Sequence, residues 1–301
     1  MILVNGENVT DFRTEKYNPG FRMLEIVENC PFVGRDFETR NILTALAAGQ
    51  NVVLYGQSGL GKTAFAEWAK KAFGAGECIE TYSYKKFKHA DEIDETKTNI
   101  VIFEDYNYYW NNHNSREEIH PEIMDKCLLR IKFEKLSDED FREMLLSGND
   151  TNDDIAISAD EINFWKEEIS KIEIPDEIFT TILKMSTNER ISIGDGEWYK
   201  ALQLLKASAY FNRNEEVFWE DFKILFDSIF QDGSISSIHD DQVDIFLDVL
   251  AQSVYRNKDE LGNQYDEGWY GRNYIIWDGG DERRYSREEA KEYFKELIFE
   301  E

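Results

Sequence analysis

The sequence predicts an α/β fold in three parts: a domain built on a parallel sheet, an all-helical domain after it, and a small α/β extension at the C-terminus. Three observations support this prediction. Short apolar runs alternate with amphipathic helical patterns over roughly the first 135 residues. Helical periodicity then dominates to about residue 235. Beyond that point the pattern changes to a helix, a stretch of glycine, aromatic and charged residues, and a last helix.

We therefore expect four segments along the chain. They are an N-terminal extension over 1–27, an α/β domain over 28–135, a helical domain over 136–235 and a C-terminal extension over 236–301. A chain of 301 residues is long enough for about two domains that each bury a core. The apolar content of 42% excludes a disordered chain.

Net charge narrows the classes of partner. The chain has 61 acidic and 34 basic residues, a formal charge of -27 at pH 7. Such a field repels phosphate backbones and anionic lipid, so we expect no direct nucleic-acid partner. No export signal and no apolar run near the ~18 residues of a transmembrane helix is present, so we expect no membrane insertion. Three cysteines without disulfide or zinc spacing favour a cytoplasmic location.

The elements of the α/β domain follow from hydrophobic patterning. Residues 36–48 predict an amphipathic helix, and residues 51–55 predict a short buried strand. A glycine-rich turn leads from that strand into a predicted helix over 62–73. A second strand is expected over 80–87. The unbroken apolar run over 99–103 predicts a third strand that is covered on both faces.

Helix-start signals follow one another in the next part of the chain. Ser137 and Ser158 each precede an acidic first turn, as N-cap residues do. Pro175 is expected in the first turn of another helix. The apolar spacing over 198–210 gives the clearest helix of the chain, and a further helix is expected around 218–230.

The C-terminal extension is predicted to contain a helix over 243–250 and a last helix opened by a capping box from Ser286 to Glu289. Between them, aromatic residues, glycine and arginine gather over 269–277. Such residues are common in interfaces, so this stretch is either a partner-binding hairpin or the core of a small appended module.

The strongest chemical motif is GQSGLGKT over residues 56–63. It follows a predicted buried strand and opens a predicted helix, which is the context of a phosphate-binding loop. Its glycines let backbone N–H groups turn towards a phosphate, and the helix N-terminus adds a positive dipole end. Lys62 would reach phosphate oxygens and the Thr63 hydroxyl would hold Mg²⁺. The candidate nucleotide-binding residues are Gly56, Ser58, Gly59, Gly61, Lys62, Thr63 and Ala64.

Glu104 and Asp105 follow the third apolar run. Carboxylates beside a phosphate loop hold Mg²⁺ and activate water, usually with the aspartate first. Here the order is reversed, with Glu104 as the expected second metal ligand beside Thr63 and Asp105 as the expected water activator. A displacement of ~1 Å can cost about 10²-fold in rate, so we expect hydrolysis to suffer more than binding. The alternative is that the pair simply ends a strand.

These motifs, with the segments around them, resemble the MoxR/RavA group of AAA+ ATPases over roughly residues 28–232. The segments that resemble the family are PFVGR over 31–35, the phosphate loop, KCLLR over 126–130, FREML over 141–145, IPDEIF over 174–179 and WYKALQLLKASAYF over 198–211.

The resemblance implies a P-loop AAA+ core with a helical lid, assembled as a homo-oligomeric ring, a hexamer, with ATP and Mg²⁺ between subunits. Val33 and Gly34 would then lie by the adenine. It also implies chaperone-like remodelling of a protein partner, with a von Willebrand factor A domain protein as the expected associate.

One departure from the family concerns the sheet. Between Asp105 and Ile119 there is no room for the helix, hairpin and strand that the family places there, so we expect the sheet to be one strand short. Two alignments are open. Residues 99–105 are either the Walker B strand with the next strand deleted, or the sensor-1 strand with Asn107 as its polar residue. The acidic pair favours the first.

Other departures concern groups that assist hydrolysis. The family's inter-subunit arginine falls at Lys126, which keeps the charge but loses the bidentate fork, and Arg130 is a candidate substitute. Gly196 and Glu197 stand where the family has paired arginines, one of them sensor 2. Catalytic groups that act as a unit depend on one another, so changing several of them can remove most of the rate enhancement. We therefore expect weak or absent hydrolysis.

Two functions therefore remain open. The first is an ATPase that remodels a protein partner with turnover. The second is a non-hydrolysing relative that acts as an interaction or inhibitor protein on a host or homologous complex. A kinase or nucleic-acid motor is disfavoured by the resemblance to the helical lid and by the net charge of -27.

Overall fold

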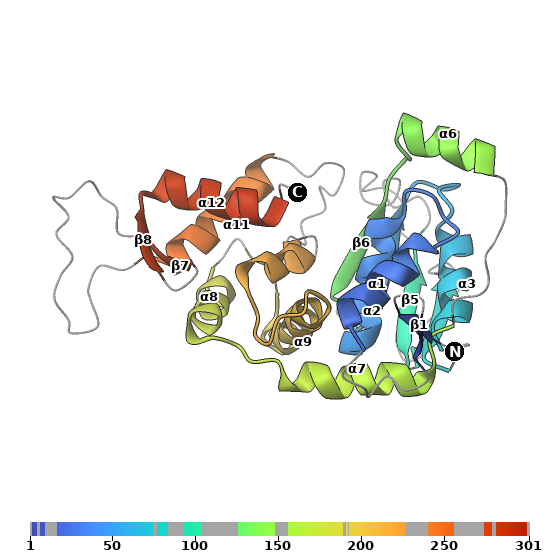
Figure 1. Ribbon diagram of the computed structural model, residues 1–301. Helices are drawn as coiled ribbons and strands as arrows, with labels where there is room; N and C mark the ends of the chain where they lie inside the picture. The colour runs from blue at the N-terminus through green and yellow to red at the C-terminus, as the bar shows by residue number, and fades with distance from the viewer. Residues whose placement is uncertain are drawn as a thin grey trace, which may run out of the picture.

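A computed structural model gives the fold of the chain (Figure 1). It describes residues 2–4, 7–9, 17–74, 77–83, 93–94, 96–103, 126–147, 156–188, 191, 193–226, 240–255, 274–278 and 281–299. The α/β part lies on one side of the molecule and the C-terminal helices on the other, with helix α7 running beneath (Figure 1). No helix within these ranges is long and apolar enough to cross a membrane.

A parallel sheet forms the centre of the α/β part. Its strands are β3 (Val52–Gly56), β4 (Ile79–Ser83), β5 (Thr98–Ile102) and β6 (Leu129–Phe133), in the order β4-β5-β3-β6. Every neighbouring pair is parallel. The strands expected over 51–55 and 99–103 are confirmed. Of the strand expected over 80–87, residues 80–83 belong to β4 and residues 84–87 lie outside the described ranges. The sheet formed by the described residues has four strands. The phosphate-loop strand β3 is central, between β5 and β6.

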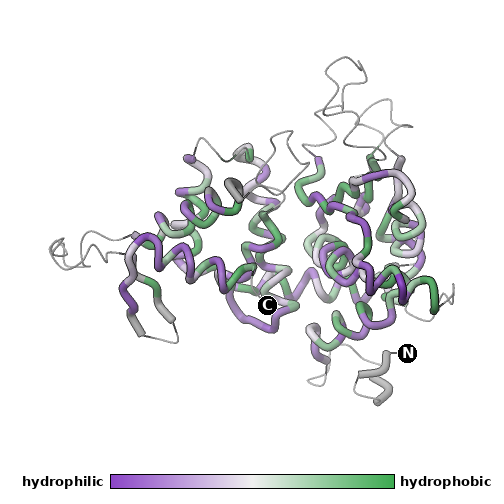
Figure 2. The backbone as a smooth tube through the Cα atoms, turned by 90° about the horizontal axis from the view of Figure 1, so that it is seen from above, coloured by the Kyte–Doolittle hydropathy of each residue, from purple (hydrophilic) through white to green (hydrophobic). Residues whose placement is uncertain are grey.

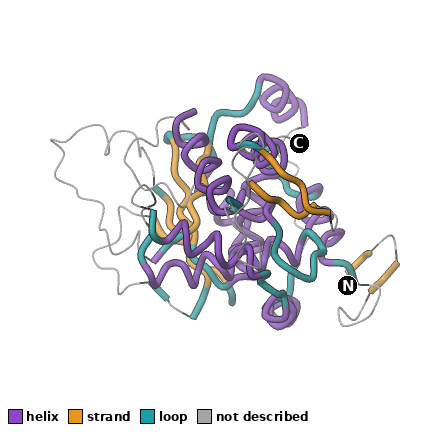
Figure 3. The backbone as a smooth tube through the Cα atoms, turned by 90° about the vertical axis from the view of Figure 1, so that its left-hand side faces the viewer, coloured by secondary structure: helices purple, strands orange, loops and turns teal. Residues whose placement is uncertain are grey.

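Both faces of β3 are buried, as its unbroken apolar run predicted. Val52 and Leu54 share one core with α2 (Asp36–Ala48) and α3 (Lys62–Ala72). Val53, on the other face, is also fully buried. Figure 3 shows helices packed beside the strands of the sheet. This central placement fixes the base of the loop that follows β3.

Helix α1 (Pro19–Glu28) was not expected from the polar sequence around it. Asn18 caps the helix by accepting a hydrogen bond from the Phe21 N–H at 3.1 Å, and Pro19 occupies the first turn. Its Met23 and Ile26 are buried in the main core. Most of the second half of the expected N-terminal extension therefore belongs to the folded body.

The helical part follows β6. Its elements are α6 (Asp138–Ser147), α7 (Ala159–Lys171), α8 (Asp176–Ser186), α9 (Asp195–Phe211) and the 3-10 helix η3 (Trp219–Leu225). Helices α7 and α9 pack directly against α2. The Ser158 side chain accepts from the Glu161 N–H at 3.1 Å, which confirms the predicted N-cap. Pro175 lies at the N-cap of α8, one residue before its first turn.

The C-terminal part contains α11 (Asp240–Ser253), an antiparallel hairpin of β7 (Tyr274–Asp278) and β8 (Asp281–Tyr285), and α12 (Arg287–Phe299). The predicted capping box is present, because the Ser286 N–H donates to Glu289 at 2.8 Å. Ile276 of the hairpin is buried in the main core, which supports the appended-module interpretation for this strand. Residues 269–273 lie outside the described ranges.

A second antiparallel hairpin, β1 (Ile2–Val4) with β2 (Glu7–Val9), lies at the periphery near the N-terminus (Figure 3). Elsewhere the helices alternate between hydrophobic and hydrophilic residues along their length (Figure 2). This alternation is typical of amphipathic helices that bury one face.

Candidate functional site

The phosphate loop leaves the sheet at the carboxyl end of β3. Neighbours β5 and β6 run parallel to β3 and hold it on both sides, with Val52 opposite Ile100 and Leu129. The loop then turns into α3, whose N-cap is Gly61. The predicted strand–loop–helix context is therefore confirmed.

Gly56 can only be glycine in this backbone. Its φ is 136°, and a Cβ added there would lie 2.4 Å from the Phe133 carbonyl oxygen of β6. Contacts under 3.0 Å essentially never occur for real Cβ atoms. The first glycine of the motif thus lets the loop pass close to the neighbouring strand.

Gly59 and Gly61 serve a different purpose. Both have positive φ values, 85° and 88°, and a Cβ at either position would meet no atom within 4 Å among the described residues. Their backbone therefore borders open space at the start of α3. This open space lies at the N-terminus of α3, where the helix dipole favours an anion.

Lys62 is folded over the loop. Its side chain is only 3% exposed, and Nζ donates to the carbonyl oxygens of Gly56 at 2.9 Å and Gln57 at 2.6 Å. Ser58, Thr63 and Ala64 are exposed beside it. The motif thus brings together a buried ammonium group, two hydroxyl groups and a helix N-terminus.

Val33 and Gly34 precede α2. Val33 is half-buried, and Gly34 has a positive φ of 68°. A Cβ at Gly34 would lie 2.9 Å from the Asp140 carboxylate in the first turn of α6. Ser137 holds that turn, because its Oγ accepts from the Asp140 N–H at 3.0 Å. A pocket of about 300 Å³ lies here, between residues 34–38 and 132–140.

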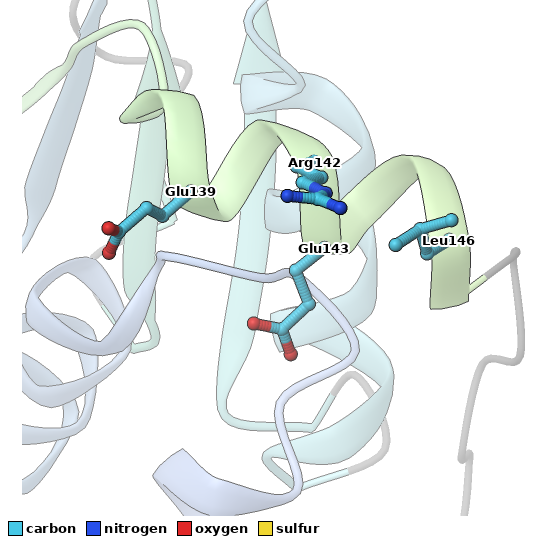
Figure 4. A pocket seen from close by; sticks show the side chains of 4 residues that line it. All are labelled: Glu139, Arg142, Glu143 and Leu146. Carbon is cyan, nitrogen blue, oxygen red and sulfur yellow. The ribbon is translucent and has the colours of Figure 1, made fainter.

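A second pocket lies against α6. It has a volume of about 440 Å³, and its described lining is Glu139, Arg142, Glu143 and Leu146 (Figure 4). Two of these four side chains are carboxylates, which repel phosphate groups. No residue of the phosphate loop belongs to that lining, so this pocket is separate from the candidate phosphate site.

Glu104 and Asp105 lie outside the described residues, as does Asn107. The strand before them is described: β5 ends at Ile102, and the Phe103 N–H donates to the Leu54 carbonyl at 2.8 Å. This strand is a direct neighbour of β3. The assignment of Glu104 as a metal ligand and of Asp105 as the water activator stays a prediction.

Lys126 and Arg130 differ in placement. Lys126 precedes β6 at the edge of the sheet opposite the phosphate loop, where its carbonyl accepts from Asn51 at 3.0 Å. Lys126 therefore does not lie beside the phosphate loop of its own chain. Arg130 lies inside β6, opposite Val53, and is 4% exposed. A residue that reaches into a neighbouring subunit must be exposed, so this geometry disfavours Arg130 as a substitute finger.

Glu197 has a local structural role in α9. Its carboxylate accepts from the Gly194 N–H at 2.8 Å and so closes the N-terminus of the helix. The Glu197 carboxylate therefore satisfies a backbone donor at the start of the helix.

Sequence reasoning did not single out Arg35. The residue is 7% exposed, and its guanidinium donates to Glu38 at 2.6 Å, to the Glu134 carbonyl at 2.9 Å and to the phosphate-loop Leu60 carbonyl at 3.4 Å. Burial raises the pKa of Glu38 above its usual range, and the charge of Arg35 opposes that rise. The signal available was a lone arginine directly before a predicted helix.

Comparison with known proteins agrees with this architecture. No protein-family model matches the chain. The chain is similar to the crystal structure of a protein described as a "putative ATPase" from Cytophaga hutchinsonii, with a TM-score of 0.56 and 14% sequence identity. The similarity covers 74% of this chain and 91% of that one. At this identity the likeness shows the fold alone: a mixed α/β domain on a parallel sheet with helices after it.

Proposed function

We propose that the chain binds ATP together with Mg²⁺ at the phosphate loop. The observation that supports this most is the open space beside Gly59 and Gly61 at the N-terminus of α3, next to a buried lysine. Residues other than glycine are strained at these positive φ values. Because glycine has no Cβ, the backbone at both positions stays open to a ligand. A loop built in this way suits close approach to a phosphate.

The residues present fit this ligand by their chemistry. Lys62 would exchange its bonds to loop carbonyls for phosphate oxygens, and the exposed Thr63 hydroxyl would bind Mg²⁺ with Glu104 as the expected second ligand. Mg²⁺ supplies neutralisation of charge on the β- and γ-phosphates when bound. Val33 and Gly34 would border the nucleoside, beside the first turn of α6.

At the level of family, we propose a MoxR/RavA-like protein that acts as a chaperone-like remodeller or assembly factor on a protein partner. Its ring, with the hexamer as the expected size, would bring Lys126 of one copy towards the nucleotide of the next. Support comes from the quoted sequence segments and from the placement of Lys126 at the far edge of the sheet. A von Willebrand factor A domain protein remains the expected associate.

We expect hydrolysis to be weak or absent. Lys126 is a point charge in place of a bidentate arginine, and Glu197 is used as a helix cap where the family has a sensor cation. These features equally favour the alternative function, a non-hydrolysing relative that acts as an interaction or inhibitor protein on a host or homologous complex. The two functions differ in turnover, which can be measured directly.

The test is to incubate the purified chain with labelled ATP and Mg²⁺, remove free nucleotide, and identify the nucleotide that stays bound. Lys62→Ala is the blank, because it removes the ammonium group and leaves the glycines in place. Retained intact ATP is the expected result and favours the non-hydrolysing function. Retained ADP with continuing phosphate release would establish an ATPase. Retention no greater than the blank, in a variant with an unchanged melting temperature, would refute nucleotide binding.

A further inference from the structure

Arg35 joins three separate parts of the chain through one buried guanidinium. One nitrogen, Nη1, donates to Glu38 in the first turn of α2 at 2.6 Å. The other, Nη2, donates to the Leu60 carbonyl at 3.4 Å and to the Glu134 carbonyl at 2.9 Å. The guanidinium carbon also lies 4.6 Å from the centre of the Phe133 ring. A single side chain thus contacts the phosphate loop and the end of β6.

The bond to Leu60 bears on the shape of the phosphate loop. In a trans peptide the C=O of one residue and the N–H of the next point in opposite directions. With the Leu60 carbonyl held by Arg35, the N–H of Gly61 therefore points away from Arg35. Gly61 is also a residue whose Cβ position borders open space. By holding the Leu60 carbonyl, Arg35 thus orients the Gly61 N–H towards the side of the loop that faces away from Arg35.

The bond to Glu134 holds the segment that connects the sheet to α6. This connector comprises residues 134–137, and the first turn of α6 contacts Gly34, the residue before Arg35. At the same place the Phe133 carbonyl lies against Gly56 of the loop. The phosphate loop and this connector are therefore held in a fixed relative position by the contact between Gly56 and the Phe133 carbonyl and by the hydrogen bonds of Arg35. Arg35 donates to one carbonyl in the loop, at Leu60, and to one in the connector, at Glu134. A change in the conformation of the loop would therefore change the hydrogen bonds that Arg35 makes to the connector.

We infer that Arg35 is a positioning residue for the nucleotide site: it presets the phosphate loop for its ligand and couples the loop to the connector that leads into α6. The inference rests on the proposed function of nucleotide binding. It assigns to Arg35 no contact with the nucleotide. Coupling of this kind is reciprocal, so nucleotide binding should in turn order the connector.

The variants are Arg35→Lys and Arg35→Ala, with Arg22→Lys as the matched control. Arg22 is likewise buried, and it binds a carboxylate, Glu161, at 3.0 Å and the Ala156 carbonyl at 3.3 Å, but among its described contacts none is to the phosphate loop. A lysine keeps the charge in both places but presents one nitrogen instead of a planar fork. The comparison therefore separates a general cost of losing a buried arginine from an effect on the loop.

The first measurement is the Kd for Mg–ATP, taken below the melting temperature of every variant. We expect Arg35→Lys to bind about tenfold more weakly than wild type, the size of effect expected for lost hydrogen bonds to a charged group, and Arg35→Ala more weakly still. Arg22→Lys should bind as wild type does. Added guanidinium ion should restore affinity to Arg35→Ala, whereas methylammonium, which lacks the fork, should not.

The second measurement is hydrogen exchange of residues 134–137 with and without Mg–ATP. Nucleotide should slow exchange there in wild type and in Arg22→Lys, and should not do so in Arg35→Ala. Unchanged affinity in both Arg35 variants would overturn the inference while leaving nucleotide binding intact. Equal weakening by Arg22→Lys would also overturn it, because the effect would then be general. If wild type retains no more ATP than Lys62→Ala, nucleotide binding itself fails.

Discussion

Gly56 and Gly196 show how differently two glycines contribute to one chain. At Gly56 the backbone has a φ of 136° and a Cβ would lie 2.4 Å from a main-chain oxygen, which cannot move aside as a flexible side chain could. At Gly196, in the first turn of α9, a Cβ would meet nothing within 4 Å of the described structure. Glycine is therefore required at the first position and merely tolerated at the second.

We predict that Gly56→Ala lowers the free energy of unfolding by more than about 2 kcal/mol, because strain and steric overlap add. Gly196→Ala should leave it unchanged or raise it by up to about 1 kcal/mol, because alanine restricts the unfolded chain and favours helix. Urea denaturation followed by circular dichroism measures both. Equal stability of the two variants would contradict the close approach of β6 to the loop.

At this scale the sequence predicted the backbone geometry of the loop better than the side chains that contact it. The glycine spacing and Lys62 were recognised because a phosphate loop depends on local backbone geometry, which a short motif encodes. Arg35 was missed because its role depends on carbonyl groups at residues 60 and 134, far apart in the sequence. The burial of Arg130 was missed for the same reason, since neighbouring strands decide which residues of β6 are enclosed.

At the scale of elements, the junction between α9 and η3 depends on one buried carboxylate. Asp221 is fully buried and accepts hydrogen bonds from Ser208 at 2.7 Å, Asn212 at 2.9 Å and the Phe218 N–H at 2.9 Å. It caps the 3-10 helix and ties it to the last turns of α9. Burial raises the pKa of Asp221 to about 6, although its hydrogen bonds act in the opposite direction.

The raised pKa predicts a pH dependence of stability. A carboxyl group whose folded pKa lies above its unfolded value stabilises the fold fully below the unfolded pKa, about 4, and this contribution is lost as pH rises through the folded value. Between pH 4 and pH 7 the free energy of unfolding of the wild type should therefore fall by about 2–3 kcal/mol relative to that of Asp221→Asn, whose amide does not titrate.

Unfolding free energies measured at several pH values test this, with Glu215→Gln as the control. Glu215 is exposed nearby in the sequence and is not among the groups that shift the Asp221 pKa, so its variant should follow the wild-type pH profile. A difference between wild type and Asp221→Asn that stays constant from pH 4 to pH 7 would contradict the buried cap.

The elements with regular periodicity were predicted well, whereas elements fixed by tertiary contacts were not. Helix α2 occupies the predicted residues 36–48. Of the helix expected around 218–230, residues 219–225 form the 3-10 helix η3, Phe226 is α-helical, and residues 227–230 lie outside the described ranges. Helix α1 was missed because a polar sequence hides four buried residues, among them Arg22, whose burial depends on Glu161 of α7. Local pattern cannot reveal a partner more than a hundred residues away.

At the scale of the whole molecule, one continuous apolar core is opposed by an excess of negative charge. Buried residues from Met23 to Ile298 belong to a single cluster, so the parts of the chain stabilise one another. The formal charge is -27, and repulsion between unpaired carboxylates favours more expanded states. Buried pairs such as Arg22 with Glu161 are screened little by salt, whereas repulsion across the surface is screened strongly.

We therefore predict that salt stabilises the chain at neutral pH. Raising NaCl from about 0.1 M to about 1 M shortens the Debye length from about 10 Å to about 3 Å, which removes most surface repulsion and should raise the melting temperature by a few degrees. Salt also weakens favourable surface pairs such as Lys171 with Glu168, but 61 acidic against 34 basic residues make repulsion the larger effect.

The control is the same salt series at pH 4.5, the pI calculated from the sequence. At this pH the net charge is close to zero. The rise in melting temperature with added NaCl should therefore shrink to the small general effect of salt on the burial of apolar surface. The difference between the two slopes isolates the contribution of net charge. A melting temperature that falls with salt at pH 7 would mean that surface ion pairs outweigh repulsion. Equal slopes at both pH values would mean that net charge has no bearing on stability.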